Sequence, residues 1–111
     1  MNKINFEEFK KAEMTLGKIL SVEKIPDTDK LLKLSVDFKE ESPRQIISGI
    51  SLYFPDPSVL VGKKCMFVTT LEPRTIRGYE SNGMIMALST DEGKFSLLEV
   101  DYPMQEGTKA K

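Results

Sequence analysis

The sequence predicts a single all-β domain over residues 1–111, in which five strands close into a small barrel with short helices and with N- and C-terminal extensions. Two observations predict this fold. Apolar and polar residues alternate over 32–38, and further apolar runs follow at short intervals, separated by turn residues. A barrel removes the exposed edges of so small a sheet. We assign the core to about 14–89 and the extensions to 1–13 and 90–111.

The first extension contains a short amphipathic helix over 5–13. Asn5, followed three residues later by Glu8, forms the pattern of a capping box, and Phe6 and Phe9 share one face of the predicted helix. The first strand follows at 15–22, where Gly17 marks a bulge or a bend of the barrel.

The middle of the chain contains the clearest strand. A turn over 26–29 leads to the strand 32–38, whose strict alternation predicts one buried and one exposed face. A charged turn at 40–43 joins it to a third strand over 45–50.

The segment 51–62 separates the third strand from the fourth. Asp56 can cap a helix, Pro57 suits its first position, and Gly62 suits the residue just after its end. A fourth strand follows at 64–71, then a polar loop at 72–82 and a fifth strand at 83–89. A turn at 91–93 leads into a hairpin-like tail at 95–100.

Five strands with a helix between the third and the fourth are the order of elements of an OB-fold barrel. A sandwich or an SH3-like barrel has similar strands, but the position of the helix favours the OB fold. OB folds bind oligonucleotides over strands two and three and with two loops, which here correspond to 25–30 and 72–82.

Composition excludes most catalytic sites. The chain has no His and a single cysteine, Cys65, so one chain can form neither a disulfide framework nor a His/Cys zinc site. The His-dependent arrangements of hydrolases are also absent. We therefore expect a binding module with no catalytic residue, no metal and no cofactor.

The charge of the chain limits how it can bind nucleic acid. Sixteen Lys and Arg residues stand against 17 Asp and Glu residues, a formal net charge of −1, so binding must depend on a local basic patch and on shape. The sequence has no long apolar stretch and no leader pattern, and we expect no membrane partner and a cytoplasmic, reducing setting.

The two loops supply a candidate patch. Lys30 and Lys33 lie in or beside the first loop, and Arg74, Arg77 and Tyr79 lie in the second. The alternatives are a solvated Lys33, a bulge at Ser48-Gly49 and a Met84 that fills the core.

Four runs of sequence resemble the tRNA-binding domain family: KLLKLSVD at 30–37, RQIISGI at 44–50, LEPR at 71–74 and GYESNGMI at 78–85. The resemblance extends over about 6–108. This OB-fold module occurs freestanding, with methionyl-tRNA synthetase as a C-terminal domain or beta subunit, in phenylalanyl-tRNA synthetase beta chains and in EMAP-like factors.

The resemblance implies a homodimeric, non-catalytic protein that binds the outside of folded tRNA and assists an aminoacyl-tRNA synthetase, with the methionyl catalytic subunit as a candidate partner. By motif match, the tRNA contacts are Lys30, Lys33, Arg44, Ser48, Arg74, Ser81, Asn82 and Met84, and Arg77 lies in the same loop. The chain departs from the family at Ile25, where His is usual, at Glu72, where Lys is common, and in lacking a Gly after Phe38. These departures reduce the local positive charge.

A chaperone-like, protein-binding OB dimer is the alternative function. The related secretion-chaperone branch usually lacks the stretch ESNGM, which this chain has at 80–84 and which favours the synthetase-associated branch.

The extensions predict a two-fold homodimer, because they contain more apolar surface than a small barrel needs to cap its ends. The predicted interface comprises Phe6, Phe9, Phe95, Leu97, Leu98 and Tyr102, with Val100 beside them. Like extensions form the dimer contact in the family. The alternative is a tail that folds back onto its own barrel.

Overall fold

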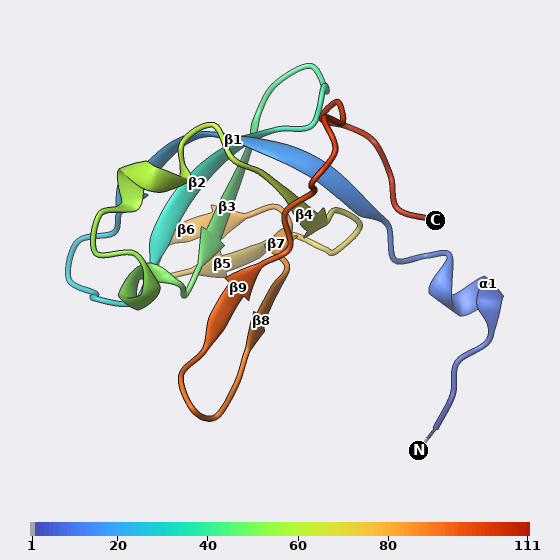
Figure 1. The fold of residues 1–111 in the computed structure, drawn as a ribbon, viewed down its shortest axis with the longest axis horizontal. Helices are drawn as coiled ribbons and strands as arrows, with labels where there is room; N and C mark the ends of the chain where they lie inside the picture. The colour runs from blue at the N-terminus through green and yellow to red at the C-terminus, as the bar shows by residue number, and fades with distance from the viewer. Residues whose placement is uncertain (1) are drawn as a thin grey trace.

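Five antiparallel strands form a nearly closed barrel in the computed structural model, which describes residues 2–111 (Figure 1). The strand order β3-β2-β1-β4-β7 joins β3 (Arg44–Ser48), β2 (Leu32–Asp37), β1 (Met14–Lys24), β4 (Lys64–Val68) and β7 (Met84–Ile85). The predicted all-β class is confirmed, and the barrel is consistent with an OB-like fold.

The alternation in β2 builds the centre of the core. Leu32, Leu34 and Val36 are fully buried, and the residues between them are partly exposed, as the sequence pattern predicts. β2 pairs with β1 on one side and with β3 on the other. The buried side chains of β1, β3 and β4 complete a single cluster with these residues.

The irregularity of β1 is not at Gly17. The register of β1 against β2 shifts between Ile19 and Ser21, so the bulge lies beyond the position that the sequence suggested. Gly17 permits a close approach instead, because a Cβ there would lie 2.5 Å from Phe38 Cε1 and 2.6 Å from Val36 Cγ1.

The segment 72–82, predicted as a loop, contains a hairpin of β5 (Arg74–Ile76) and β6 (Tyr79–Ser81). Its two-residue turn, Arg77-Gly78, has positive φ at both positions, 54° and 85°, the geometry of a type I′ hairpin turn. The loop prediction was wrong because the polar composition of this segment concealed a short strand pair.

Residues 80–82 lie against the free edge of β3 and nearly close the barrel. Gln45 O accepts a hydrogen bond from Asn82 N–H (2.8 Å), and Gln45 Nε2 donates to Glu80 O (2.9 Å). The Ile47 N–H donates to Ser81 Oγ (2.9 Å). A side-chain hydroxyl thus takes the place of one strand-to-strand hydrogen bond.

The predicted fifth strand at 83–89 divides at Met86 into two strands of different sheets. β7 pairs with β4, whereas β8 (Ala87–Ser89) pairs with β9 (Phe95–Leu97). The hairpin-like tail is therefore confirmed, although its second strand ends at Leu97. The fourth strand is also shorter than predicted and ends at Val68.

The helices are short. The capping box of Asn5 and Glu8 is present, but α1 extends only over Phe6–Phe9 and lies apart from the barrel at the end of an extended segment (Figure 1). The single helix predicted after β3 is replaced by two 3-10 turns, η1 (Ser51–Tyr53) and η2 (Pro57–Leu60), the second capped by Asp56 as expected. Within residues 2–111, no helix is long and apolar enough to cross a membrane.

The C-terminal segment lies along its own barrel. Isolated bridges join Thr15 to Lys109 and Cys65 to Glu99. Lys109 Nζ also forms an ion pair with Glu13 Oε1 (2.6 Å). The tail therefore contacts both β1 and β4.

Candidate nucleic-acid interface

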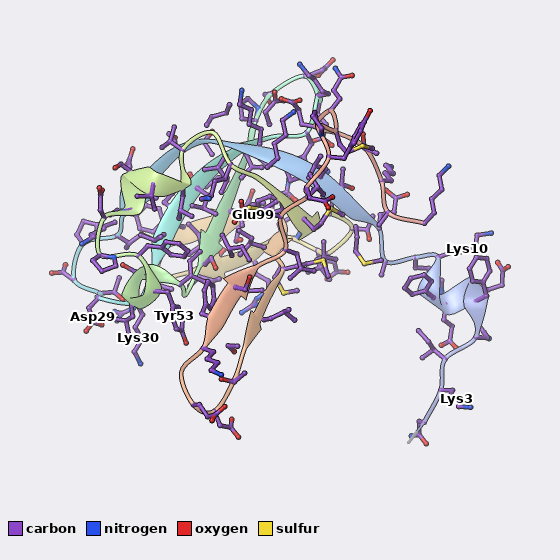
Figure 2. The ribbon with its side chains drawn as sticks, viewed as in Figure 1. Lys3, Lys10, Asp29, Lys30, Tyr53 and Glu99 are labelled. Atoms are coloured by element: carbon purple, nitrogen blue, oxygen red, sulfur yellow. The ribbon has the colours of Figure 1, made fainter. Side chains whose placement is uncertain are left out.

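The first loop presents Lys30 to solvent at one end of the barrel (Figure 2). Its backbone is fixed on both sides: the Lys30 N–H donates to Thr28 Oγ1 (3.2 Å), and Lys30 O accepts from Ser51 N–H (3.1 Å). Buried Ile25 anchors the start of the loop. A fixed backbone with a free ammonium group is suited to a phosphate contact.

Lys33 is less available. It lies on β2 opposite Glu23 of β1, and the two side chains form an ion pair (3.2 Å). Its ammonium group also lies 5.4 Å from the centre of the Tyr79 ring, a cation–π distance. A phosphate that binds Lys33 must compete with Glu23. Nothing in the sequence indicates this contact between Lys33 and Tyr79.

The β5–β6 hairpin carries two exposed cations. Arg74 on β5 and Arg77 in the turn are both exposed, and neither forms an ion pair within the described residues 2–111. Met84, on β7, is 48% exposed, so the alternative that it fills the core is wrong. These three side chains remain free to contact a ligand.

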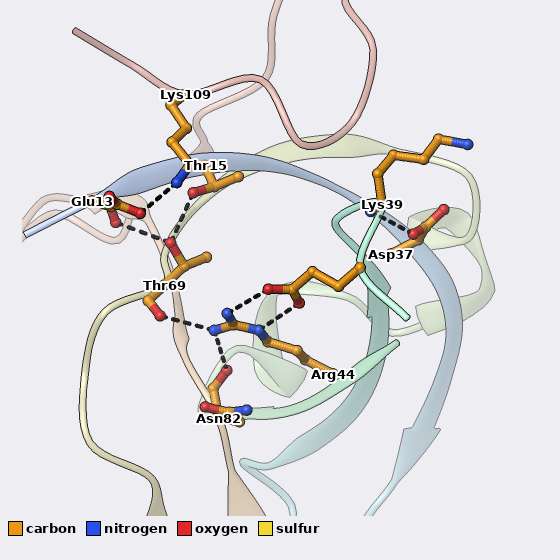
Figure 3. A network of polar contacts seen from close by, with 9 residues as sticks. Glu13, Thr15, Asp37, Lys39, Arg44, Thr69, Asn82 and Lys109 are labelled. Atoms are coloured by element: carbon orange, nitrogen blue, oxygen red, sulfur yellow. Dashed lines mark hydrogen bonds and ion pairs between the residues drawn. The ribbon is translucent and has the colours of Figure 1, made fainter. Parts of the chain in front are cut away.

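Arg44 is used inside the protein (Figure 3). Its guanidinium donates to Glu40 through Nε and Nη2 (2.8 Å each), to Thr69 O (2.8 Å) and to Asn82 O (3.4 Å). Thr69 and Asn82 precede and follow the β5–β6 hairpin, so Arg44 contacts the chain on both sides of it. It also lies over the Phe38 ring, 5.4 Å from its centre.

The electrostatics around Arg44 do not favour a phosphate. The hollow beside it is also lined by the carboxylates of Glu40, Glu41 and Glu80. The hydrogen bond from Arg44 lowers the pKa of Glu40, and the same bond raises the pKa of Arg44. In the sequence, Glu40 and Arg44 lie four residues apart across the charged turn, and this spacing was the available signal for their ion pair.

The remaining predicted contacts differ in access. Ser81 is 5% exposed, and its hydroxyl accepts from Ile47 N–H and donates to Gly83 O (3.1 Å), so it supports the hairpin. Asn82 is partly exposed, and its backbone is used by Gln45 and Arg44. Ser48 is half-buried at the end of β3, opposite Leu32.

The predicted interface residues also divide into two groups. Leu97 is 8% exposed and belongs to the core of its own barrel, Phe95 packs against that core, and Leu98 is half-buried. Phe6, Phe9 and Tyr102 are exposed. Within residues 2–111, no cluster of His, Cys, Asp and Glu is placed to hold a metal ion.

The geometry defines a small antiparallel barrel of the OB-like class, with free cations on one loop and one hairpin. The chain matches the sequence model of the family described as "Putative tRNA binding domain" over residues 14–109. It belongs to this family.

Comparison with curated proteins places the chain near parts of larger enzymes. It is 48% identical to the methionine--tRNA ligase of Methanospirillum hungatei over 108 residues, which cover 97% of this chain and 16% of that protein. It is 38% identical to the methionine--tRNA ligase of Enterococcus faecalis over 104 residues, 94% of this chain and 16% of that protein. The chain thus spans about a sixth of the length of these relatives.

Solved structures share the whole fold. A MetRS related protein from Pyrococcus horikoshii superimposes with a TM-score of 0.91 at 38% identity, over 100% of both chains. The chaperone CsaA from Bacillus anthracis superimposes with a TM-score of 0.86 over 99% of this chain and 100% of that chain. At 24% identity, the second likeness shows the fold alone.

Proposed function

We propose that the chain is a tRNA-binding module without catalytic activity, which binds the outside of folded tRNA and assists an aminoacyl-tRNA synthetase, in the first place the methionyl enzyme. The family match over 14–109 is the observation that carries this proposal. The relatives support it further, because the chain corresponds to only 16% of each ligase. These partners would place the module in the cytoplasm.

The contact surface we propose consists of the free cations and their neighbours. Lys30, Arg74 and Arg77 would bind phosphates, Asn82 would hydrogen-bond a ribose or a base edge, and Met84 would support an exposed base. Lys33 and Ser48 would contribute at the margin of this surface. Arg44 and Ser81 would act indirectly, by holding the hairpin.

The proposal is tested by comparing the affinity of the chain for folded tRNA and for an unstructured RNA of the same length. We expect folded tRNA to bind more tightly. Arg74→Ala should weaken tRNA binding about tenfold, since hydrogen bonds to charged groups contribute about 1.5 kcal/mol or more. Lys3→Ala also removes one positive charge and is the control. Lys3 lies at the far end of the molecule from Lys30, another of the proposed phosphate contacts (Figure 2).

Two outcomes would contradict this proposal. Equal affinity for both RNAs would remove the dependence on shape. Equal losses from Arg74→Ala and Lys3→Ala would indicate diffuse electrostatic attraction instead of a site. Lys109→Ala would be an unsuitable control, because the Lys109 ammonium group is paired with Glu13 (2.6 Å).

The alternative function, a chaperone-like protein-binding dimer, is tested with the same preparation. The alternative predicts that the chain suppresses aggregation of an unfolded client protein at equimolar concentration without binding tRNA. Binding of tRNA with no effect on aggregation is the result that our proposal predicts.

We further propose that two copies form a homodimer through the N-terminal helix and the tail. The exposed rings of Phe6 and Phe9 lie 6.4 Å apart on α1, which extends away from its own barrel (Figure 1). On the barrel, an apolar groove is lined by Leu16, Met66, Val100, Met104, Thr108, Lys109 and Ala110. Insertion of α1 of one copy into this groove of the other would bury both surfaces.

Sedimentation equilibrium tests the dimer. We expect about twice the chain mass of 12.6 kDa at tens of micromolar protein, and a shift to the monomer mass for Phe6→Ser/Phe9→Ser. Since neither ring is buried in the chain, the fold should survive this change. A monomer mass for the unaltered protein would refute the dimer.

A further inference from the structure

Three aromatic rings form a cluster outside the surface proposed above, and two of them are stacked. Tyr53 of η1 lies over Phe95 of β9 with ring centres 4.1 Å apart and planes inclined by 10°. Phe54 meets Phe95 edge-on, at 5.8 Å and 83°. Because Phe54 and Phe95 pack against the core, Tyr53 is the outer ring of a stack whose base is anchored.

Tyr53 is not covered by the rest of the chain. The residue is 44% exposed although one face of its ring lies on Phe95. The rings border a hollow of about 430 Å³, which Lys63, Ser96 and Glu99 also line. Hollows that hold small ligands measure about 300–1,000 Å³, so this one has room for a single planar group.

The charges near Tyr53 suit a nucleotide. Lys30 is adjacent, since its carbonyl oxygen accepts a hydrogen bond from the N–H of Ser51 in η1 (3.1 Å), and Figure 2 shows both labelled side chains at the same end of the barrel. Lys63 also lines the hollow, but it is paired with Glu99 (3.3 Å), so Lys30 is the available cation. Cations beside an aromatic face are the combination with which proteins bind unpaired nucleotides.

We propose that Tyr53 stacks on one unpaired base of the bound RNA while Lys30 contacts a neighbouring phosphate. This inference rests on the tRNA-binding function proposed above and adds a site to it. Every base has a π face, so the contact is independent of sequence, but that face is accessible only where the RNA is unpaired. A base-stacking site at Tyr53 would thus favour folded RNAs with single-stranded loops or ends over a continuous duplex.

The experiment uses the full chain with folded tRNA and with a blunt-ended RNA duplex as probes. Tyr53→Ala should weaken tRNA binding about tenfold, within the range measured for loss of one base–aromatic stack, and should leave duplex binding unchanged. Tyr53→Leu keeps an apolar side chain without a flat ring and should also lose affinity, whereas Tyr53→Phe should retain it. Leu88→Ala is the control, because Leu88 is 64% exposed and does not line the hollow.

A direct signal comes from a tryptophan at this position. The chain has no Trp, so Tyr53→Trp adds a single fluorophore that a stacked base should quench, while Leu88→Trp should give no change. This variant keeps a large ring on Phe95, so its fold should be retained.

The outcomes separate the two proposals. If the unaltered chain binds tRNA but Tyr53→Ala binds equally well and Tyr53→Trp is not quenched, the stacking site is refuted and tRNA binding stands. If Tyr53→Leu retains full affinity, or Tyr53→Ala weakens duplex binding equally, the contact is not a base stack. If the unaltered chain does not bind tRNA, the proposed function and the site that depends on it both fail.

Discussion

Replacement of Arg44 by Ala should destabilise the fold rather than remove a contact with RNA. The side chain is 19% exposed, and its guanidinium bonds Glu40, Thr69 O and Asn82 O (Figure 3). Without it, both ends of the β5–β6 hairpin lose their common partner. The hairpin should therefore become mobile before the barrel unfolds.

The magnitude follows from the individual bonds. Glu40 is 44% exposed, so its ion pair contributes about 1 kcal/mol, as for well-formed surface pairs. The 2.8 Å bond to Thr69 O joins a charged donor to a carbonyl and contributes about 1.5–3 kcal/mol, whereas the 3.4 Å contact with Asn82 O adds little. We expect Arg44→Ala to lower the free energy of unfolding by about 3 kcal/mol, or the Tm by roughly 10 °C.

Urea and thermal unfolding measure this change, with Arg77→Ala as the control, since Arg77 is exposed and unpaired among the residues described. Arg44→Lys should lose the forked geometry and recover only part of the stability. The new mobility should appear in residues 74–81 as faster amide hydrogen exchange and as a change in the tyrosine spectrum. If Arg44→Ala unfolds like Arg77→Ala but loses tRNA affinity, Arg44 is a direct RNA contact and the positioning argument is wrong.

Three further predictions concern Glu40, Gly17 and Cys65. The hydrogen bond from Arg44 lowers the pKa of Glu40 below its usual 4.5, so the stabilisation from this bond is complete above the unfolded pKa and is lost as the pH falls through the folded pKa. The difference in urea unfolding between wild type and Glu40→Gln should therefore shrink steadily as the pH falls below 4.5, and a difference that does not change with pH in this range would contradict this. Gly17→Ala should lower the free energy of unfolding by about 1–3 kcal/mol in the same assay, because the added Cβ would overlap Phe38. Gly49→Ala, with nothing within 4 Å of its Cβ, should lower it far less; equal losses of stability would show that the close approach at Gly17 is unimportant. Burial raises the pKa of Cys65 to about 11, so the thiol should react with a disulfide reagent at pH 8 much more slowly in the folded protein than in urea; equal rates would mean that the thiol is accessible.

The sequence predicted the fold where the signal is local and failed where distant partners decide. The alternation over 32–38 and the capping box at Asn5 are complete within a few residues, and both appear as expected. The run 83–89 is evenly apolar, so nothing in it shows that the strand divides. The division is set from outside: the Met86 N–H bonds Met66 O, and the next residues pair with β9 instead.

The candidate site shows the same limit. The sequence located Lys30, Arg74 and Arg77 on the two loops, and the structure leaves all three exposed. It could not show that Arg44 also bonds Thr69 O and Asn82 O, or that Ser81 bonds Ile47 N–H, because these partners lie 25–38 residues away in the chain. Residue type alone does not distinguish a cation that binds a ligand from one that binds the protein.

The distribution of ion pairs explains how a chain of net charge −1 can present a basic patch. Within residues 2–111, six pairs neutralise cations: Lys10–Glu7, Lys33–Glu23, Arg44–Glu40, Lys63–Glu99, Lys64–Glu106 and Lys109–Glu13. The hairpin cations Arg74 and Arg77 are among the cations without such a partner in these residues, so both guanidinium groups are available to a polyanion. Arg44 and Ser81 bond the hairpin to the rest of the barrel. The guanidinium groups of Arg74 and Arg77 are therefore carried by a positioned element of the barrel and not by a flexible tail. We expect a folded RNA, whose phosphates are already held at fixed spacings, to gain more from two such positioned groups than an unstructured strand, which must first be ordered.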